Sequence, residues 1–263
     1  MLRLIDDDFE GNRIAILRSL TTLRLMSLHP HLADPKYPRE SPSVKIDTLL
    51  DQLEEIAAEG HRALVFSQFT GYLALIRERL AERSIEYAYL DGGTRDRAAR
   101  IAEFRSGTQP VFLISLKAGG FGLTLTEADY VFVMDPWWNP AAENQAVDRT
   151  HRIGQDKTVM VYRLVAANTI EEKVVALQER KRALFDQVVT GGALQSGVLT
   201  ADDVRAVLGL EEATRSQGAG AGRKRTVKDT ASAPSTRITG KPETRKRAAS
   251  PGWAPGSSPD RNP

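Results

Sequence analysis

The most constraining feature of this sequence is a regular alternation, between residues 44 and 190, of short apolar segments with amphipathic ones. Apolar segments without a polar face are typical of strands buried on both sides, the arrangement of a parallel sheet with helices on both faces. The alternation therefore predicts an α/β fold. Expected strands are 63–66, 87–90, 111–116, 130–134 and 159–165, and expected helices are 44–58, 72–83, 94–104, 141–152 and 169–189.

The segments that flank this alternation differ from it in composition. Apolar residues spaced by three and four predict a helix at 11–28, which His29-Pro30 ends. A short helix capped by Thr200 is expected beyond Gly191-Gly192. After about Arg215 large aliphatic side chains almost vanish, which predicts disorder. The expected organisation is therefore a helical linker at 1–43, the α/β domain at 44–190, a helical appendix at 191–212 and a disordered basic tail at 213–263.

Composition excludes several kinds of site. The chain has no cysteine, and its four histidines lack zinc-ligand spacing, so we expect no disulfide and no metal site. The acidic start and the short apolar runs resemble neither a signal peptide nor a membrane span. We therefore expect an intracellular protein, in a bacterial cytoplasm or, in a eukaryote, in the nucleus.

Charge is divided unevenly along the chain. The tail, residues 213–263, holds 11 Lys/Arg and 3 Asp/Glu, which leaves 25 and 31 in residues 1–212. The tail is thus +8 and the remainder −6. An acidic body argues against a globally basic nucleic-acid binder, so DNA contact there requires a local surface, whereas the tail can bind polyanions through charge alone.

The strongest chemical signal is the run from Gln145 to Gln155, at the end of an expected helix. Arg149 and Arg152 lie three residues apart and project from nearly the same helix face. Paired planar guanidiniums suit the charge that develops on a transferring phosphoryl group. The alternative is an ordinary solvated face on which Asp148 and Glu143 pair with the arginines.

Three further signals stand at expected strand ends. The glycine-rich run from Ser115 to Gly122 permits close approach of backbone N–H groups to a phosphate, or simply forms a tight turn, and it is not a Walker A loop. The Trp137-Trp138 pair lies between two prolines, so at most one ring is expected to point inward, leaving the other for a nucleic acid. Ser67-Gln68 offers phosphate ligands, or caps a turn.

Together these segments resemble the C-terminal helicase lobe of the SWI/SNF ATPase family, within helicase superfamily two. The resemblance extends from about Ile46 to Val189, and Thr21 to His31 is similar to the family's linker into this lobe. Five motifs occur in the family's order, namely Val65 to Phe69, Leu90-Asp91-Gly92 with Thr94, Ser115 to Gly122, the Trp-Trp stretch and Gln145 to Gln155. The implied fold is a RecA-like parallel sheet with helices on both faces.

The resemblance also implies roles for individual residues. Arg149 and Arg152 correspond to arginine fingers that reach ATP and Mg²⁺ held mainly by a first lobe. The remaining roles concern DNA: Gln145, Gly120 and Gly122 couple the nucleotide state to DNA, Ser67, Gln68, Ser115, Lys117 and Gly119 contact the backbone, and Trp138 lies against the duplex. The expected partners are double-stranded DNA, a first RecA-like lobe in cis or in trans, and a DNA-bound protein complex as the remodelling target, with no membrane partner.

One departure from the family limits the expected activity. The phosphate-loop lysine and the magnesium-binding Asp-Glu pair of the first lobe do not occur in this sequence. We therefore expect a fragment, a truncated reading frame or half of a split motor, which alone hydrolyses ATP at no more than the background rate. A second hypothesis is a non-catalytic DNA-binding or regulatory module. A third, a Rossmann-like nucleotide binder, lacks its glycine fingerprint.

Overall fold

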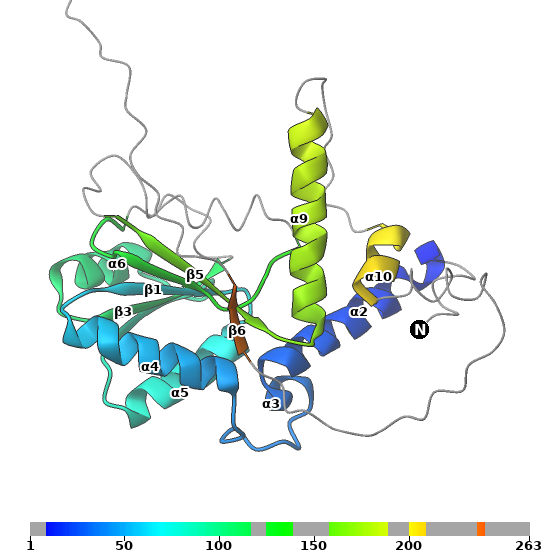
Figure 1. Cartoon of the computed structure of the whole chain (residues 1–263). Coiled ribbons are helices and arrows are strands. Elements are labelled where there is room, and N and C mark those ends of the chain that lie inside the picture. Colours follow the sequence, from blue (N-terminus) through cyan, green and yellow to red (C-terminus); the bar gives the residue numbers. More distant parts are fainter. Residues whose placement is uncertain (1–8, 117–124, 139–157, 189–199, 209–235, 240–263) are drawn as a thin grey trace, which may run out of the picture.

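The computed structural model of the chain describes residues 9–116, 125–138, 158–188, 200–208 and 236–239 (Figure 1). A parallel sheet forms its centre, as predicted. Its strands are β1 (Ala63–Ser67), β2 (Tyr87–Leu90), β3 (Val111–Ser115), β4 (Tyr130–Val133) and β5 (Met160–Ala166), in the spatial order β2-β3-β1-β4-β5. All neighbouring pairs among these five strands are parallel.

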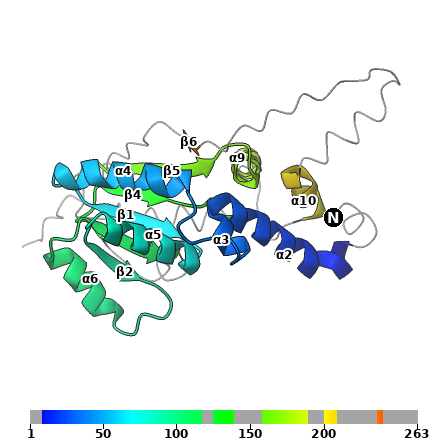
Figure 2. The same ribbon diagram turned by 90° about the horizontal axis from the view of Figure 1, so that it is seen from below.

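Helices cover both faces of this sheet, which confirms the expected layering (Figure 2). Helices α4 (Val44–Ala58) and α5 (Thr70–Glu82) pack with Ala63 and Val65 of β1 in one hydrophobic cluster. Helix α6 (Arg97–Ser106) packs with Leu64 and Phe66 in a second cluster. Since successive residues of one strand enter opposite clusters, every residue of β1 is buried.

A third hydrophobic cluster lies at one end of the sheet. Helices α2 (Phe9–Leu28), α9 (Ile170–Val188) and α10 (Ala201–Leu208) meet there, and α10 lies beside α9 and α2 in Figure 1. Its buried members are Ile16, Leu20, Val174, Leu177, Val204 and Val207. The N-terminal helix is therefore packed onto the α/β domain rather than separate from it.

Helix ends largely follow the sequence signals. Ser43 accepts the N–H of Ile46 at 3.4 Å at the start of α4. Thr200 and Asp203 exchange bonds of 2.9 and 3.2 Å before α10, a capping box. Before α9, Thr169 accepts the N–H of Glu171 at 3.1 Å, and Glu172 accepts the N–H of Asn168 at 2.9 Å.

One strand was not predicted. Residues Thr236–Thr239 form β6, which pairs antiparallel with the Arg163–Ala166 half of β5, at the edge of the sheet. The rest of the tail, residues 213–235 and 240–263, lies outside the described residues. Within the described helices, none combines the length and hydropathy that a membrane span requires.

A buried histidine joins α2 to α3 (Pro30–Ala33) and to the connector that follows. His29 is only 2% exposed; its Nδ1 accepts the N–H of His31 at 3.2 Å, and its Nε2 lies 2.9 Å from the carbonyl oxygen of Ser41. The proton of the neutral ring therefore sits on Nε2 and is donated to Ser41. Burial lowers the pKa of His29 below its ordinary value.

This lowered pKa predicts a loss of stability in mild acid. Below about pH 6.5 the unfolded imidazole binds a proton that the folded one resists, so the free energy of unfolding decreases as the pH falls from about 6.5 to the lowered pKa. We expect His29→Asn to flatten this part of the profile, measured by urea unfolding at several pH values. The matched control, His31→Asn, should keep the slope. Equal slopes in the wild type and His29→Asn would contradict the assignment.

Candidate functional site

The carboxyl ends of three neighbouring strands form the candidate site. Ser67 ends β1 and Ser115 ends β3, and these residues are register partners. Asp135 follows β4, the other neighbour of β1. Ligands of open α/β sheets bind outside this edge. Two segments that follow this edge in the sequence, 117–124 and 139–157, lie outside the described residues. They carry seven of the predicted site residues: Lys117, Gly119, Gly120, Gly122, Gln145, Arg149 and Arg152.

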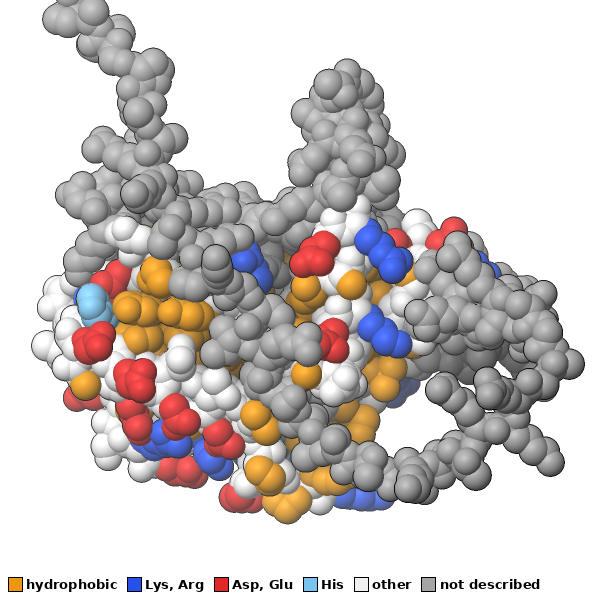
Figure 3. Space-filling model, in the orientation of Figure 1, with side chains coloured by type: hydrophobic (Ala, Val, Ile, Leu, Met, Phe, Trp, Pro, Cys, Tyr) orange, Lys and Arg blue, Asp and Glu red, His pale blue; other side chains and the backbone are white. Residues whose placement is uncertain are grey.

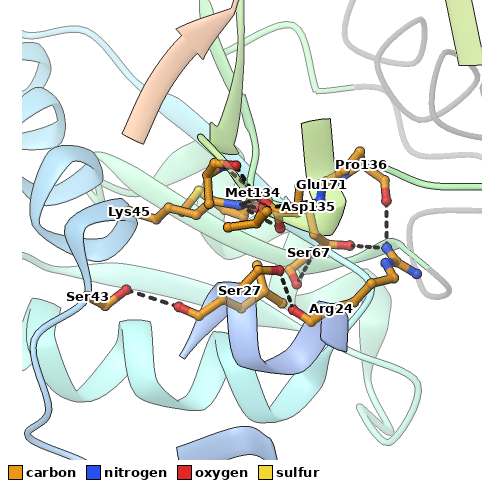
Figure 4. Close-up of polar contacts among 12 residues, drawn as sticks. Arg24, Ser27, Ser43, Lys45, Ser67, Met134, Asp135, Pro136 and Glu171 are labelled. Carbon is orange, nitrogen blue, oxygen red and sulfur yellow. Dashed lines mark hydrogen bonds and ion pairs between the residues drawn. The ribbon is translucent and has the colours of Figure 1, made fainter. Parts of the chain in front are cut away.

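A buried carboxylate ties the loops of this edge together. Asp135 is 1% exposed, and its Oδ2 accepts the hydroxyl of Ser67 at 2.5 Å and the N–H of Gln68 at 3.2 Å (Figure 4). Burial raises the pKa of Asp135, while Ser67, Arg24 and Gln68 act in the opposite direction. The loop after β4 is thereby bonded to the loop after β1.

The cation that faces Asp135 comes from α2. Arg24 is 4% exposed, donates to the carbonyl oxygen of Pro136 at 2.5 Å and lies 3.7 Å from Oδ1 of Asp135. Its Cζ atom lies 5.2 Å from the ring centroid of Phe69 and 5.3 Å from that of Trp138. No role was predicted for Arg24 from the sequence. The only signal was its place in the linker-like segment.

A second buried ion pair, between α4 and α9, contacts the residue that precedes Asp135. Lys45 of α4 donates to both carboxylate oxygens of Glu171 of α9, at 2.8 and 3.0 Å, and to the carbonyl oxygen of Met134. Glu171 also accepts the N–H of Ala166 at 2.8 Å. Burial raises the pKa of Glu171, and Lys45 opposes that shift. The pair thus joins two helices to the residue before Asp135.

The predicted DNA-contacting side chains that the structure describes are buried to different degrees. Ser67 and Ser115 are at most 2% exposed, whereas Gln68 and Trp138 are half-buried. The hydroxyl of Ser67 is used within the lobe, so its direct contact with a phosphate stays a prediction. At most one inward tryptophan was expected, but Trp137 and Trp138 are both half-buried and pack against different hydrophobic clusters.

The face formed by α4 and α5 is not basic. Arg79 bonds Asp47 at 3.1 Å, and Arg83 bonds Asp51 at 2.9 Å and Glu54 at 3.1 Å. Figure 3 shows acidic and basic side chains interleaved over this part of the surface. Among the side chains that the structure describes, no three His, Asp or Glu gather as a metal site.

The strand order, the helices on both faces and the polar carboxyl edge define a RecA-like α/β lobe. Residues 44–154 match the family model of the helicase conserved C-terminal domain. The C-terminal part of the Fun30 ATPase domain is 32% identical, with a TM-score of 0.55, covering 72% of this chain and 62% of that chain. The Sulfolobus solfataricus SWI2/SNF2 ATPase C-terminal domain is 27% identical, with a TM-score of 0.57, covering 78% and 88%.

Curated relatives agree with the structural ones. DNA repair protein RAD5 of Cryptococcus neoformans is 45% identical over 176 residues, which cover 65% of this chain and 15% of RAD5. Protein CHROMATIN REMODELING 24 of Arabidopsis thaliana is 45% identical over 149 residues, 56% of this chain and 14% of that protein. The chain thus spans about a seventh of these relatives. It carries the C-terminal helicase lobe of the SNF2 family of ATPases.

The buried Lys45–Glu171 pair yields a stability prediction. Lys45→Met or Glu171→Gln leaves one buried group without its charged partner, so each should lower the free energy of unfolding by about 3–5 kcal/mol. The double variant Lys45→Met with Glu171→Gln should lose less than the two single losses combined, which urea unfolding of the four proteins measures.

An exposed ion pair provides the matched control. Arg39 and Glu78 are bonded at 2.5 Å but are 41% and 50% exposed, so Arg39→Ala should leave the free energy of unfolding almost unchanged. Losses below about 1 kcal/mol for both buried single variants would show that the Lys45–Glu171 pair does not hold α4 and α9 to the sheet.

Proposed function

We propose that this chain is the second motor lobe of an ATP-dependent translocase on double-stranded DNA. The observation that carries the proposal is the meeting of Ser67, Ser115 and Asp135 at one sheet edge of an SNF2-family lobe. These are the points from which the three motif loops depart. Loops with phosphate-binding composition at a carboxyl edge favour a nucleotide- and DNA-dependent activity over a purely structural lobe.

In this proposal the lobe completes an ATP site that a first lobe provides. Arg149 and Arg152 act as arginine fingers on ATP and Mg²⁺, and Gln145, Gly120 and Gly122 couple the nucleotide state to DNA. A guanidinium stabilises charge that develops on the transferring phosphoryl group, and its effect requires a nucleotide that is already positioned. The chain alone is therefore expected to hydrolyse ATP at no more than the background rate.

The proposed DNA contacts lie at the same edge. Gln68 and Trp138 are half-buried and so retain exposed surface for a duplex, whereas Ser67 and Ser115 are almost fully buried. Lys117 and Gly119 are proposed to bind the backbone phosphates. Since residues 1–212 carry a net charge of −6, binding by the lobe depends on these local contacts rather than on overall charge.

The finger assignment is tested by supplying a first lobe. With the first lobe of an SNF2-family ATPase, in cis or in trans, the chain should give DNA-stimulated ATP hydrolysis. Arg149→Ala and Arg152→Ala should each lower the turnover number by about 10³–10⁵. The control Arg100→Ala removes a guanidinium bonded to Glu103 on α6 and should leave the turnover number unchanged. Normal turnover in both finger variants would remove the assignment.

The charge of the tail favours a second candidate function, a non-catalytic module bound to DNA. Two truncations separate the sources of affinity. Removing 240–263 takes away 5 Lys/Arg and 2 Asp/Glu but keeps β6, whereas removing 213–263 takes away the whole +8.

Salt dependence reports how many phosphates each form contacts. If the lobe binds DNA, the chain lacking 213–263 should retain duplex affinity, with a shallower slope of log affinity against log salt. Complete loss of affinity in that truncation, measured by fluorescence anisotropy, would make the tail the binder and the lobe a passenger.

A further inference from the structure

We propose that Arg24 is a positioning residue that fixes two loops of the carboxyl edge to α2, so that the placement of α2 governs DNA contact. The two loops are the one after β1, which contains Gln68 and Phe69, and the one after β4, which contains Asp135 to Trp138. The DNA part of this inference rests on the proposed function. The structural part, the attachment of both loops to α2, does not.

Arg24 is rigidly held on its own helix. It belongs to a row of buried residues spaced by four along α2, Ile16, Leu20, Arg24 and Leu28, which is one face of a helix. Ile16 and Leu20 pack against α9 and α10, and Leu28 packs against the core under α4 and α5. The buried residues on either side of Arg24 are therefore packed against the rest of the lobe. This packing fixes the position of the backbone that carries the guanidinium.

The guanidinium contacts both loops at once. Toward the loop after β4 it meets the carboxylate of Asp135, the carbonyl oxygen of Pro136 and the ring of Trp138. Toward the loop after β1 it meets the ring of Phe69. A planar guanidinium can bond in its plane and contact aromatic rings, which a lysine ammonium does not reproduce.

The bonds of Asp135 extend this attachment to the residues proposed to meet DNA. Its carboxylate holds Ser67 and the N–H of Gln68, and the side chain of Gln68 donates to the carbonyl oxygen of Pro136 at 3.3 Å. Figure 4 shows Arg24 of α2 and Ser67 of β1 converging on Asp135 and Pro136 of the loop after β4. A displacement of α2 that left the loops behind would leave a buried carboxylate without its cation, so α2 and the loops move as one unit.

A second guanidinium of the lobe provides a matched control. Arg62 precedes β1, at the amino edge of the sheet, with its Cζ 3.9 Å from the ring centroid of Phe104. It donates to the carbonyl oxygens of Gln109, at 3.1 Å, and Phe104. Arg62 thus makes carbonyl and aromatic-ring contacts like those of Arg24, at the opposite edge of the sheet.

The experiment uses the full chain with Trp138 as its only tryptophan, through Trp137→Phe and Trp253→Phe. In this background Arg24→Lys should shift the emission of Trp138 to longer wavelength, because the ammonium leaves the indole more exposed to water. The affinity of this variant for a duplex of about 30 base pairs should fall about tenfold. Arg62→Lys should change neither the emission nor the affinity, although both variants should lower the unfolding midpoint.

A second variant keeps the proposal testable if Arg24→Lys does not fold. Folding of every variant is checked by far-ultraviolet circular dichroism. Phe69→Leu keeps the Arg24–Asp135 pair but removes the ring contact to the loop after β1. It should weaken duplex binding and leave the Trp138 emission unchanged.

Each outcome then bears on one statement. Unchanged emission in folded Arg24→Lys overturns the attachment of the loop after β4. A shifted emission with unchanged duplex affinity overturns the control of DNA contact. If the unsubstituted chain binds no duplex, the proposed function fails, whereas the emission comparison still decides whether Arg24 positions the loop.

Discussion

The carboxylate of Asp135 is the interaction on which the rest of the carboxyl edge depends. A charge at 1% exposure is stable only with a full set of partners, and here they come from three elements: Ser67 at the end of β1, Gln68 in the loop that follows, and Arg24 on α2. Satisfying one buried group therefore fixes the relative positions of two loops and a helix. The Lys45–Glu171 pair acts in a similar way: it joins α4 to α9, and Lys45 also donates to the carbonyl oxygen of Met134, the residue before Asp135.

Local patterning was sufficient to predict the sheet. Every residue of β1 and β3 is buried, and an uninterrupted apolar run is what a strand covered on both faces requires. Helix α4 was predicted from its amphipathic pattern, and its bounds agree with the expected residues 44–58. By contrast, β6 stands in a segment with few large aliphatic side chains, and its pairing with β5 is a long-range contact that no local pattern signals.

The site was predicted less completely, for a physical reason. Motif composition drew attention to Ser67, Gln68 and Trp138, which the structure places at one edge. Arg24, Lys45 and Glu171 went unassigned because their partners are distant in sequence, 112 residues for Arg24 and Pro136 and 126 for Lys45 and Glu171. For the Lys45–Glu171 pair, the sign available in the sequence was a lysine on the apolar face of α4, since a buried ammonium needs a carboxylate.

The polarity and length of β6 have a consequence for the open edge of the described sheet. Thr236 pairs with Ala166 at the carboxyl end of β5, and Thr239 pairs with Arg163 further back. The carboxyl half of β5 is therefore covered by a strand of four residues that carries a charged side chain, Arg237. Short, charged edge strands are poor templates for pairing with another chain, so β6 protects this edge against unwanted strand addition.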